Sequence, residues 1–459
     1  IRELWHEYKT TSQELLASPP LSKGSPHQAA FGSPEKLLRK KHTGFCLTGR
    51  RRLSRAHSHR HAILYGMTGT GKSSISLISS IFTTQGSMVV FDPGGDLYQA
   101  TATAMTVYRG YFVKRLHLAN PGVSDGFNPL SYYQTESEIN QLAELIVSIA
   151  LGKSPQSTYW NESAIDLLRL MIKLVRTREA KYHTLAHVYH LLAYLEAQPD
   201  KILALGKASH QPRLLIHLKS FLGRDSKLRS SVITTAQAAL QRYSDPQIGL
   251  VSSFTSLNFR ELRQRPTIIY VQVAPPDHEY YLTPHSVFWE TLFAHLMKRI
   301  PDDEELPVYM LIDEAGWLSL PSLPTTMAVA RKYFGLLLAI QNAEQLEAIY
   351  GPNGRASIEA NAWSKLFLTA QSTKTARDLS RALGMTEVDD TVRPLLTELE
   401  IRMMSQQRGL LLCGNRRPLL VALHPYYLQP KLKRWADYSR RHQLPNLTKL
   451  PSSQMGYAA

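Results

Sequence analysis

Residues 66–73 read Gly-Met-Thr-Gly-Thr-Gly-Lys-Ser, which has the form G-x-x-x-x-G-K-[ST] of a phosphate-binding loop, the P-loop. The short apolar run Ala62–Tyr65 precedes the loop, and Ser74–Ile78 follows it with the composition of a helix start. Glycines let successive backbone N–H groups face the phosphates, and the N-terminus of the next helix favours negative charge. The flanking strand and helix argue against a chance match, so the motif predicts a nucleotide-binding site. Lys72 is expected to reach the β- and γ-phosphates, and the Ser73 hydroxyl is expected to bind Mg²⁺.

A second stretch ends in two carboxylates. The apolar run Val308–Ile312 is followed directly by Asp313 and Glu314. At the tip of a buried strand, Asp313 can hold the Mg²⁺ shell, and Glu314 can orient or deprotonate the water that attacks the γ-phosphate. An acidic surface turn is the alternative, but the upstream P-loop favours an ATPase site with ATP and Mg²⁺ as cofactors. The expected nucleotide-binding residues are Gly66, Thr68, Gly69, Thr70, Gly71, Lys72, Ser73, Ser74 and Asp313, with Ser73 and Asp313 as metal ligands.

Another polar side chain follows the apolar run Leu336–Ile340. Gln341 comes directly after this run, where an amide can sense the γ-phosphate and relay its state. An amide that only caps the strand is an equal alternative from the residues alone. We therefore add Gln341 to Lys72 and Glu314 as a candidate catalytic residue.

The remaining pattern indicates an α/β fold with a mostly parallel sheet. Continuous apolar runs, which are typical of buried parallel strands, occur at 87–91, 111–113, 267–271, 365–369, 409–413 and 418–423. Between 135 and 255 the apolar residues instead recur at helical spacing, which predicts an inserted all-α domain. A helix is also expected around Ser286–Arg299. The expected organisation is a basic N-terminal segment at 1–56, a nucleotide-binding motor domain at 57–134 and 256–440, the all-α domain at 135–255, and a flexible tail at 441–459.

The charge of the chain suggests a polyanionic partner. The 459 residues carry a net charge of +16, and residues 1–60 alone hold twelve Lys and Arg against four Glu. The cluster Arg50–Arg52 can contact DNA or lipid head groups, and a solvated arm is an equal alternative. Cys46 and Cys413 lie far apart in the sequence, which fits a reducing compartment. No stretch reaches the ~18–20 apolar residues of a membrane span.

Two groups of histidines have spacings that can suggest a metal site. His57, His59 and His61 alternate, and a second set with helical spacing consists of His183, His187 and His190. No carboxylate or cysteine completes a ligand set near either group, so we interpret both as structural.

Short blocks spread over most of the chain resemble the type IV coupling proteins of bacterial conjugation and secretion, the TraG/TraD-like ATPases. The resemblance rests on 31–33 with 49–50, on 61–73, on Asp-Pro-Gly-Gly-Asp-Leu at 92–97 and on Phe-Asn-Pro-Leu at 127–130. The strongest block runs from Leu311 to Gln341 and is extended by 345–346, 350–351, 361, 375–380, 383–384, 395–397, 417–418 and 426–427. Position 94 is Gly where this family often has Lys or Asn, which puts a direct ligand role for that side chain in doubt.

This resemblance implies a RecA-like core in a homo-oligomer, expected to be a hexamer with nucleotide between subunits. It makes Arg331 the candidate arginine finger, although an ordinary surface arginine is the alternative. The family has N-terminal membrane helices that this chain lacks, and the first residue, Ile1, favours their removal. The expected location is the cytoplasmic face of the bacterial inner membrane.

The expected function is an ATP-driven motor that recruits DNA, as a relaxase–DNA complex, into a type IV secretion or conjugation channel. DNA contacts should be largely independent of sequence, and the helical domain should dock the cargo. The alternatives are a secretion receptor for effector proteins and a translocase of the FtsK/HerA kind. The insertion at 135–255 and the segment near Phe31 argue against the translocase.

Overall fold

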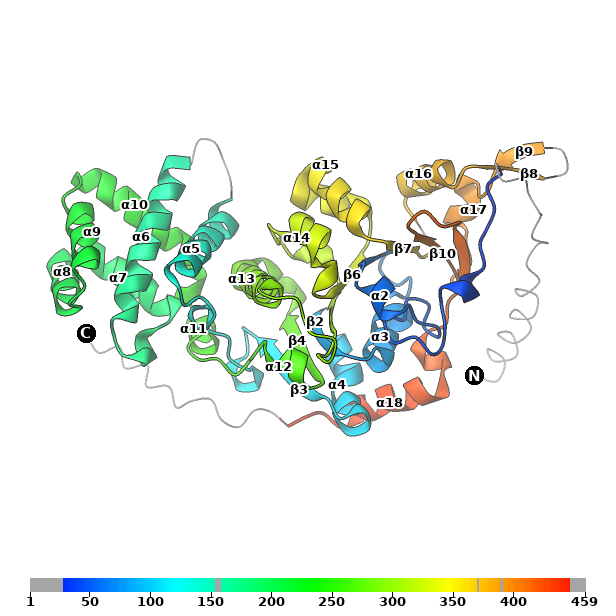
Figure 1. Cartoon of the computed structure of the whole chain (residues 1–459), viewed down its shortest axis with the longest axis horizontal. Coiled ribbons are helices and arrows are strands. Elements are labelled where there is room, and N and C mark those ends of the chain that lie inside the picture. Colours follow the sequence, from blue (N-terminus) through cyan, green and yellow to red (C-terminus); the bar gives the residue numbers. More distant parts are fainter. Residues whose placement is uncertain (1–27, 153–157, 370, 389–390, 446–459) are drawn as a thin grey trace.

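The computed structural model describes residues 28–152, 158–369, 371–388 and 391–445. Its central sheet contains the strands β1 (Ala62–Tyr65), β2 (Ser87–Pro93), β3 (Phe112–His117), β4 (Thr267–Val273), β5 (Val308–Ile312), β6 (Gly335–Ile340), β7 (Ser364–Phe367), β10 (Arg408–Cys413) and β11 (Leu419–Ala422). Their order is β11-β10-β7-β1-β6-β5-β2-β4-β3. Every neighbouring pair from β7 to β3 is parallel, whereas β10 is antiparallel to both of its neighbours. The predicted mostly parallel α/β fold is confirmed (Figure 1).

Both faces of the sheet are buried, which explains why its strands have continuous apolar sequences. Alternate side chains point to opposite faces, so Ile63 and Tyr65 of β1 join one hydrophobic cluster while Ala62 and Leu64 join the other. The first face is covered by α13 (His278–Met297), α14 (Leu323–Val329), α15 (Ala343–Asn361) and α16 (Thr373–Leu383). The second is covered by α3 (Ile78–Thr83), α4 (Asp96–Arg109) and α18 (Pro430–Arg441). Shorter elements of this body are α2 (Arg55–Ser58), α12 (Glu261–Gln264), α17 (Glu398–Arg402) and the hairpin β8 (Met385–Val388)–β9 (Thr391–Pro394).

The insertion forms a helical lobe beside the body that holds the sheet (Figure 1). Thr135 begins the lobe with a capping box, in which its side chain accepts from the Glu138 N–H and the Glu138 side chain accepts from the Thr135 N–H. Leu142 and Ile146 of the predicted stripe are fully buried, because they face the neighbouring helices. The helices are α5 (Glu136–Leu151), α6 (Thr158–Arg176), α7 (Leu185–Ala197), α8 (Pro199–Ala208), α9 (Pro212–Leu222), α10 (Ser226–Leu240) and α11 (Pro246–Val251).

Two helices begin differently from the sequence-based expectation. The P-loop leads into a wide π-helical turn, Lys72–Leu77, before the α-helix α3 starts at Ile78. Helix α13 begins at His278, eight residues before the expected Ser286, and contains Pro284. Proline removes one backbone donor from a helix, and the unpaired carbonyl four residues earlier belongs to Tyr280, which is exposed to water. The helix therefore tolerates a proline that the sequence pattern presents as a boundary.

The described part of the N-terminal segment is packed against the body. Phe45, Leu47 and Leu53 are completely buried in the second cluster, although basic residues surround them in the sequence. These three apolar side chains fill the core, so this part of the segment is packed, whereas Arg50 in the basic cluster is exposed and Arg51 and Arg52 are half-buried. The boundary expected at residue 56 falls within α2. Residues 1–27 and most of the expected tail lie outside the described residues.

Gly49 fixes the path of this segment. Its φ is +85°, and a Cβ atom would lie 1.8 Å from the carbonyl oxygen of His424, beside β11. The backbone N–H of His424 donates to the Thr48 carbonyl at 3.0 Å, so this bond keeps the segments around Gly49 and His424 close together. Only glycine fits this crossing.

We expect Gly49→Ala to lower the free energy of unfolding by more than about 3 kcal/mol, because backbone strain and a backbone clash add together. The matched control is Gly110→Ala, which has φ of +68° but no atom within 4 Å of its Cβ position. The control should cost only about 1–2 kcal/mol from strain. Urea unfolding followed by tryptophan fluorescence measures both. Equal losses would contradict the packed position of the N-terminal segment.

Candidate functional site

The candidate site lies where three neighbouring parallel strands end. Strand β6 lies between β1 and β5, and Tyr65 pairs with Ile340 while Ile312 pairs with Leu338. The P-loop follows the carboxyl end of β1, Gln341 follows that of β6, and Asp313 follows that of β5. The three stretches singled out in the sequence therefore meet at one edge of the sheet, where α/β proteins bind ligands.

The P-loop has the backbone that phosphate binding requires. Gly69 and Gly71 have φ values of +83° and +99°, a region that favours glycine. A Cβ atom at Gly71 would lie 2.6 Å from Ile75, so side-chain space is also excluded there. Met67 and Thr68 are exposed, and the Thr70 hydroxyl donates to the Met67 carbonyl at 2.7 Å. A loop that is braced internally and open outward fits a nucleotide.

Lys72 is buried at the base of the loop. Its Nζ donates to the Gly66 carbonyl at 2.8 Å and lies 3.5 Å from Glu314 Oε1. Only 4% of the side chain is exposed, so these two partners replace water around the ammonium group. The cation is thus held within the P-loop and next to the candidate catalytic carboxylate.

Asp313 and Ser73 form a second pair. The Ser73 hydroxyl donates to Asp313 Oδ2 at 3.0 Å, and Asp313 Oδ1 accepts from the Glu314 N–H at 3.0 Å. Burial, together with the Glu314 charge, raises the pKa of Asp313 to about 6, against the opposing effects of the Ser73 bond and Lys72. A hydroxyl and a carboxylate are hard oxygen donors, the ligand type that Mg²⁺ prefers. The two expected metal ligands are therefore in direct contact.

Glu314 has an unusual backbone and two side-chain partners. Its φ of +47° and ψ of +55° lie in the left-handed region, which costs a non-glycine residue roughly 1–2 kcal/mol. Its Oε2 accepts from Gln341 Nε2 at 3.2 Å, while Oε1 faces Lys72. Strained residues persist where the surroundings hold them, and they cluster at functional sites. The carboxylate is held in one orientation between the P-loop and the end of β6.

Gln341 is not the residue that caps the next helix. Asn342 has that role, since its side chain accepts from the Gln345 N–H at 3.1 Å at the start of α15. The Gln345 side chain in turn accepts from the Gln341 backbone N–H at 3.0 Å. Gln341 is therefore not the N-cap of α15, and its side-chain amide connects the end of β6 to Glu314.

Arg331 is the one candidate that the fold separates from the rest. It lies in the 3₁₀ turn Ala330–Lys332, before the start of β6, whereas Gln341 follows the end of that strand. Six residue steps at ~3.3 Å place Gly335, at the start of β6, roughly 20 Å from Gln341. Arg331 is exposed and forms no ion pair with any residue that the structure describes. It cannot reach the P-loop of its own chain.

Two buried polar side chains near the site received no role from the sequence. Gln371 follows β7, the neighbour of β1, and donates to the carbonyls of Tyr65 (3.1 Å) and Leu368 (2.6 Å). Its position after a strand end is the signal that identified Gln341. Asp92 accepts from the N–H groups of Leu97 (3.0 Å) and Tyr98 (2.7 Å), so it caps α4. Burial raises the pKa of Asp92 to about 7.

The two histidine groups take structural positions. His61 is buried, and its Nδ1 accepts from the Leu336 N–H at 3.1 Å, while His57 stacks on Trp363. Burial lowers the pKa of His59 to about 4. His187 Nδ1 lies 2.7 Å from the Thr184 hydroxyl at the start of α7. Within the described ranges, no cluster of three His, Cys, Asp or Glu residues can hold a metal.

Ser73→Ala should lower the free energy of unfolding of the nucleotide-free protein by about 1–2 kcal/mol at pH 7.5, because the buried Asp313 carboxylate then loses a donor. The control is Ser74→Ala, whose hydroxyl makes only a 3.4 Å bond to the Gly71 carbonyl. The control should change stability by less than about 0.5 kcal/mol. Urea unfolding without nucleotide or Mg²⁺ compares the two, and an equal effect would contradict the Ser73–Asp313 bond.

Comparisons with known proteins place this chain in a family. The family model for type IV secretory system conjugative DNA transfer matches residues 26–392. The protein VirD4 of Rhizobium radiobacter is 22% identical over 400 residues, and VirD4 of Agrobacterium fabrum is 21% identical. These alignments cover 82% of this chain but only 58% and 60% of the relatives, so the chain spans less than two thirds of their length.

Solved structures share the fold. The bacterial conjugative coupling protein TrwBΔN70 is 19% identical with a TM-score of 0.69, and the alignment covers 89% of this chain and 95% of that one. TrwB in complex with ADP and Mg²⁺ has a TM-score of 0.68 at 19% identity, and the alignment covers 88% of this chain and 96% of that one. VirB4 of Thermoanaerobacter pseudethanolicus is more distant, with a TM-score of 0.52 at 14% identity. That alignment covers 84% of this chain and 97% of VirB4. The likeness to these structures shows a RecA-like core with a helical domain. Since the family model covers most of the residues, the chain belongs to the type IV secretory system conjugative DNA transfer family, the type IV coupling proteins.

Proposed function

We propose that this chain is the ATP-hydrolysing motor part of a coupling protein that recruits DNA, as a relaxase–DNA complex, and drives it into a type IV secretion or conjugation channel. The observation that carries the proposal is the continuous set of contacts at the sheet edge. Lys72 contacts Glu314, Glu314 contacts Gln341, and Ser73 contacts Asp313. Each pair joins residues from different strands, so the fold itself assembles the site.

Each residue has a role that follows from its position. The N–H groups of the P-loop bind the phosphates of ATP, and Lys72 exchanges its carbonyl partner for phosphate oxygens. Glu314, oriented by Gln341, accepts a proton from the water that attacks the γ-phosphate. The Gln341 backbone N–H also donates to the Gln345 side chain of α15. A shift of Gln341 when the γ-phosphate is lost would therefore be passed to α15.

Ser73 and Asp313 would hold Mg²⁺, which neutralises charge on the phosphate oxygens when it is bound. Asp313 supports this role because its Oδ2 lies 3.0 Å from the Ser73 hydroxyl, so both expected ligands face the same point. TrwB has been solved with ADP and Mg²⁺, which supports the same cofactors here.

An incomplete site supports a homo-oligomer. Arg331 is exposed on the edge opposite the P-loop, so it can stabilise transition-state charge only in a neighbouring subunit. A ring closes such head-to-tail contacts, and we propose a hexamer.

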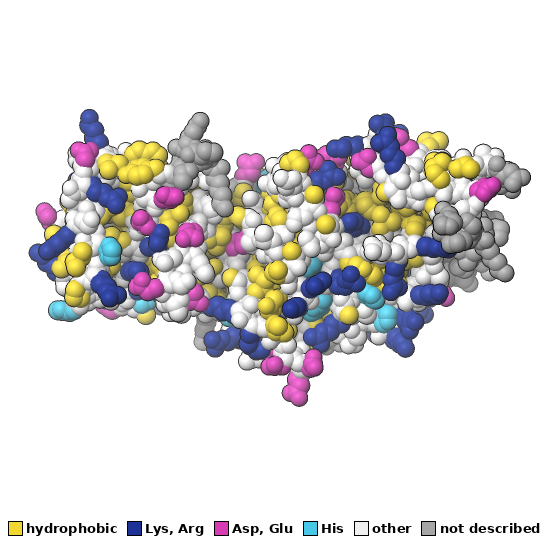
Figure 2. Space-filling model, turned by 45° about the horizontal axis from the view of Figure 1, so that its top comes forward, with side chains coloured by type: hydrophobic (Ala, Val, Ile, Leu, Met, Phe, Trp, Pro, Cys, Tyr) yellow, Lys and Arg dark blue, Asp and Glu magenta, His cyan; other side chains and the backbone are white. Residues whose placement is uncertain are grey.

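The partner and the location follow from the family and the charge. Figure 2 shows Lys and Arg side chains gathered along the lower part of the body, which suits a phosphate backbone. Among the described residues, no helix has both the length and the apolar character to cross a bilayer. We place the chain at the cytoplasmic face of the bacterial inner membrane, with the channel components of the secretion system as further partners.

ATP turnover with and without DNA tests this function. We expect single- or double-stranded DNA to raise the rate at low salt, and the increase to fade as salt rises, because phosphate contacts release counterions. Lys72→Ala should reduce turnover by ~10² or more in every condition. If effector protein raises the rate and DNA does not, the chain is a receptor for protein cargo. Turnover retained by Lys72→Ala would remove this site.

Mixed oligomers test Arg331. Arg331→Ala alone should lower turnover by ~10³, whereas Lys332→Ala, its exposed neighbour, should stay within about threefold. After subunit exchange with Glu314→Gln chains, roughly a quarter of the interfaces pair an intact Glu314 with an intact Arg331. Activity should therefore return in the mixture although each variant alone is inactive. Absence of this rescue would assign the finger to another residue.

A further inference from the structure

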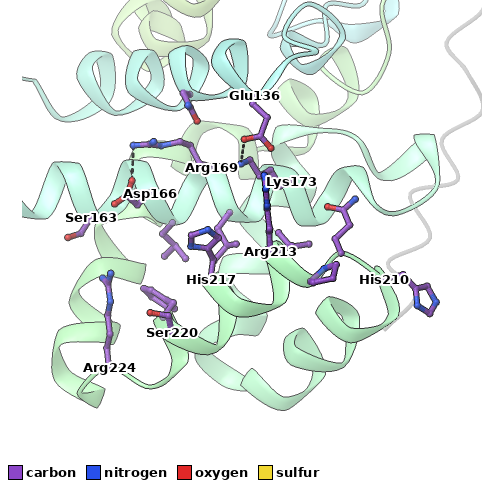
Figure 3. Close-up of a pocket in the computed structure, with 17 residues that line it drawn as sticks. Glu136, Ser163, Asp166, Arg169, Lys173, His210, Arg213, His217, Ser220 and Arg224 are labelled. Carbon is purple, nitrogen blue, oxygen red and sulfur yellow. Dashed lines mark hydrogen bonds and ion pairs between the residues drawn. The ribbon is translucent and has the colours of Figure 1, made fainter.

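The helical lobe contains a groove of about 900 Å³. Helices α5 and α6 form one wall, and α9 with the turns at its two ends forms the other (Figure 3). The groove is separate from the P-loop site, and the residues of that site do not line it.

The groove has more positive than negative charge. Its two carboxylates are already paired, since Asp166 binds Arg169 at 2.7 Å and Glu136 binds Lys173 at 2.7 Å. Arg213 and Arg224 also line the groove, and neither forms an ion pair with any described residue. Two guanidinium groups therefore remain available for an anion, and Arg is the residue best suited to bind a carboxylate with two parallel hydrogen bonds.

These cations lie on the same wall. Arg213 and His217 are one turn apart on α9, and Figure 3 shows both across the groove from α6, with Arg224 at the far end. Lys173 holds the pKa of Glu136 below its usual range, and Arg213 and His217 add smaller effects of the same sign, which places them near this carboxylate. His210 lies at the other end of the wall.

The floor between the charges is apolar. The buried side chains of Leu167, Leu214 and Phe221 line the groove, and the Arg224 guanidinium lies 5.4 Å from the centre of the Phe221 ring. Stacking on an aromatic ring leaves the edge of the guanidinium group free to bind an anion. The groove thus combines an apolar floor with a cationic wall.

We propose that this groove binds an acidic, amphipathic peptide segment of a protein partner. Apolar side chains of the segment pack on the floor, and its Asp and Glu carboxylates bind Arg213 and Arg224. A nucleic acid fits less well, because a phosphate backbone has no apolar side chains to cover the leucines. The inference deepens the cargo-docking part of the proposed function by assigning it a site and a partner chemistry.

Fluorescence anisotropy with the full chain tests this inference. The probe is a labelled helical peptide of about 15 residues, with Leu at helical spacing and Glu between the leucines. The same peptide with Gln for Glu should bind at least about tenfold more weakly, because it cannot pair with the arginines. Arg213→Glu combined with Arg224→Glu should weaken binding of the acidic peptide by a similar factor. The same variant should bind a peptide with Lys in place of Glu more tightly.

A matched control separates the site from overall charge. Lys207→Glu combined with Lys219→Glu changes the net charge equally, but these exposed lysines of α8 and α9 do not line the groove. The control should stay within about threefold of the unmodified chain. Ser220→Trp, which fills the groove without changing charge, should also abolish binding, and circular dichroism checks that each variant is folded.

Two results would overturn the inference. One is peptide binding that responds equally to both charge-reversed pairs, and the other is a DNA oligonucleotide that depends on Arg213 and Arg224 while the peptide does not. ATP turnover is measured on the same variants and should be unchanged. Failure of the unmodified chain to bind the peptide, with DNA-stimulated turnover intact, would therefore reject the groove alone. Turnover retained by Lys72→Ala, with peptide binding intact, would reject only the motor.

Discussion

The position of β6 between β1 and β5 is the constraint on which the site depends. It brings the P-loop, Gln341 and the two carboxylates to one edge of the sheet, where Glu314 contacts both Gln341 and Lys72. Parallel strands need crossover helices, and those helices bury both faces of the sheet. The same arrangement that fills the core thus lines up the nucleotide edge.

Charges at this edge are costly, and the structure compensates for them locally. The Asp313 carboxylate is partly buried, and burial together with the Glu314 charge raises its pKa, while the Ser73 bond and Lys72 act against this rise. Glu314 occupies a strained backbone conformation that only its partners hold. Removing a partner from a buried charge costs more than the net value of the contact. This arrangement is consistent with the proposed function, in which phosphates and a cation would supply the missing charges.

Sequence reasoning succeeded where local pattern and burial agree. The strands around the site are continuous apolar runs, and the residues of the P-loop and the Asp313–Glu314 pair follow from their positions at strand ends. Sequence reasoning failed where contacts between residues far apart in the sequence determine the structure. The packing of Phe45 is hidden by basic neighbours, the start of α13 is hidden by Pro284, and Gln371 was missed although it follows a strand end. The groove beside Arg213 is formed by helices far apart in the sequence, so no local pattern reveals it.

The N-terminal segment is joined to the helix that follows the P-loop. The Ser76 hydroxyl donates to the Leu47 carbonyl at 2.5 Å, and the Ser80 hydroxyl accepts from the Cys46 N–H at 2.9 Å. On its other side, the Gln429 side chain donates to the Gly49 carbonyl at 2.7 Å. Residues 46–49 are thus bonded on one side to the helix that follows the P-loop and on the other to Gln429, so a displacement of this segment would strain its bonds to that helix.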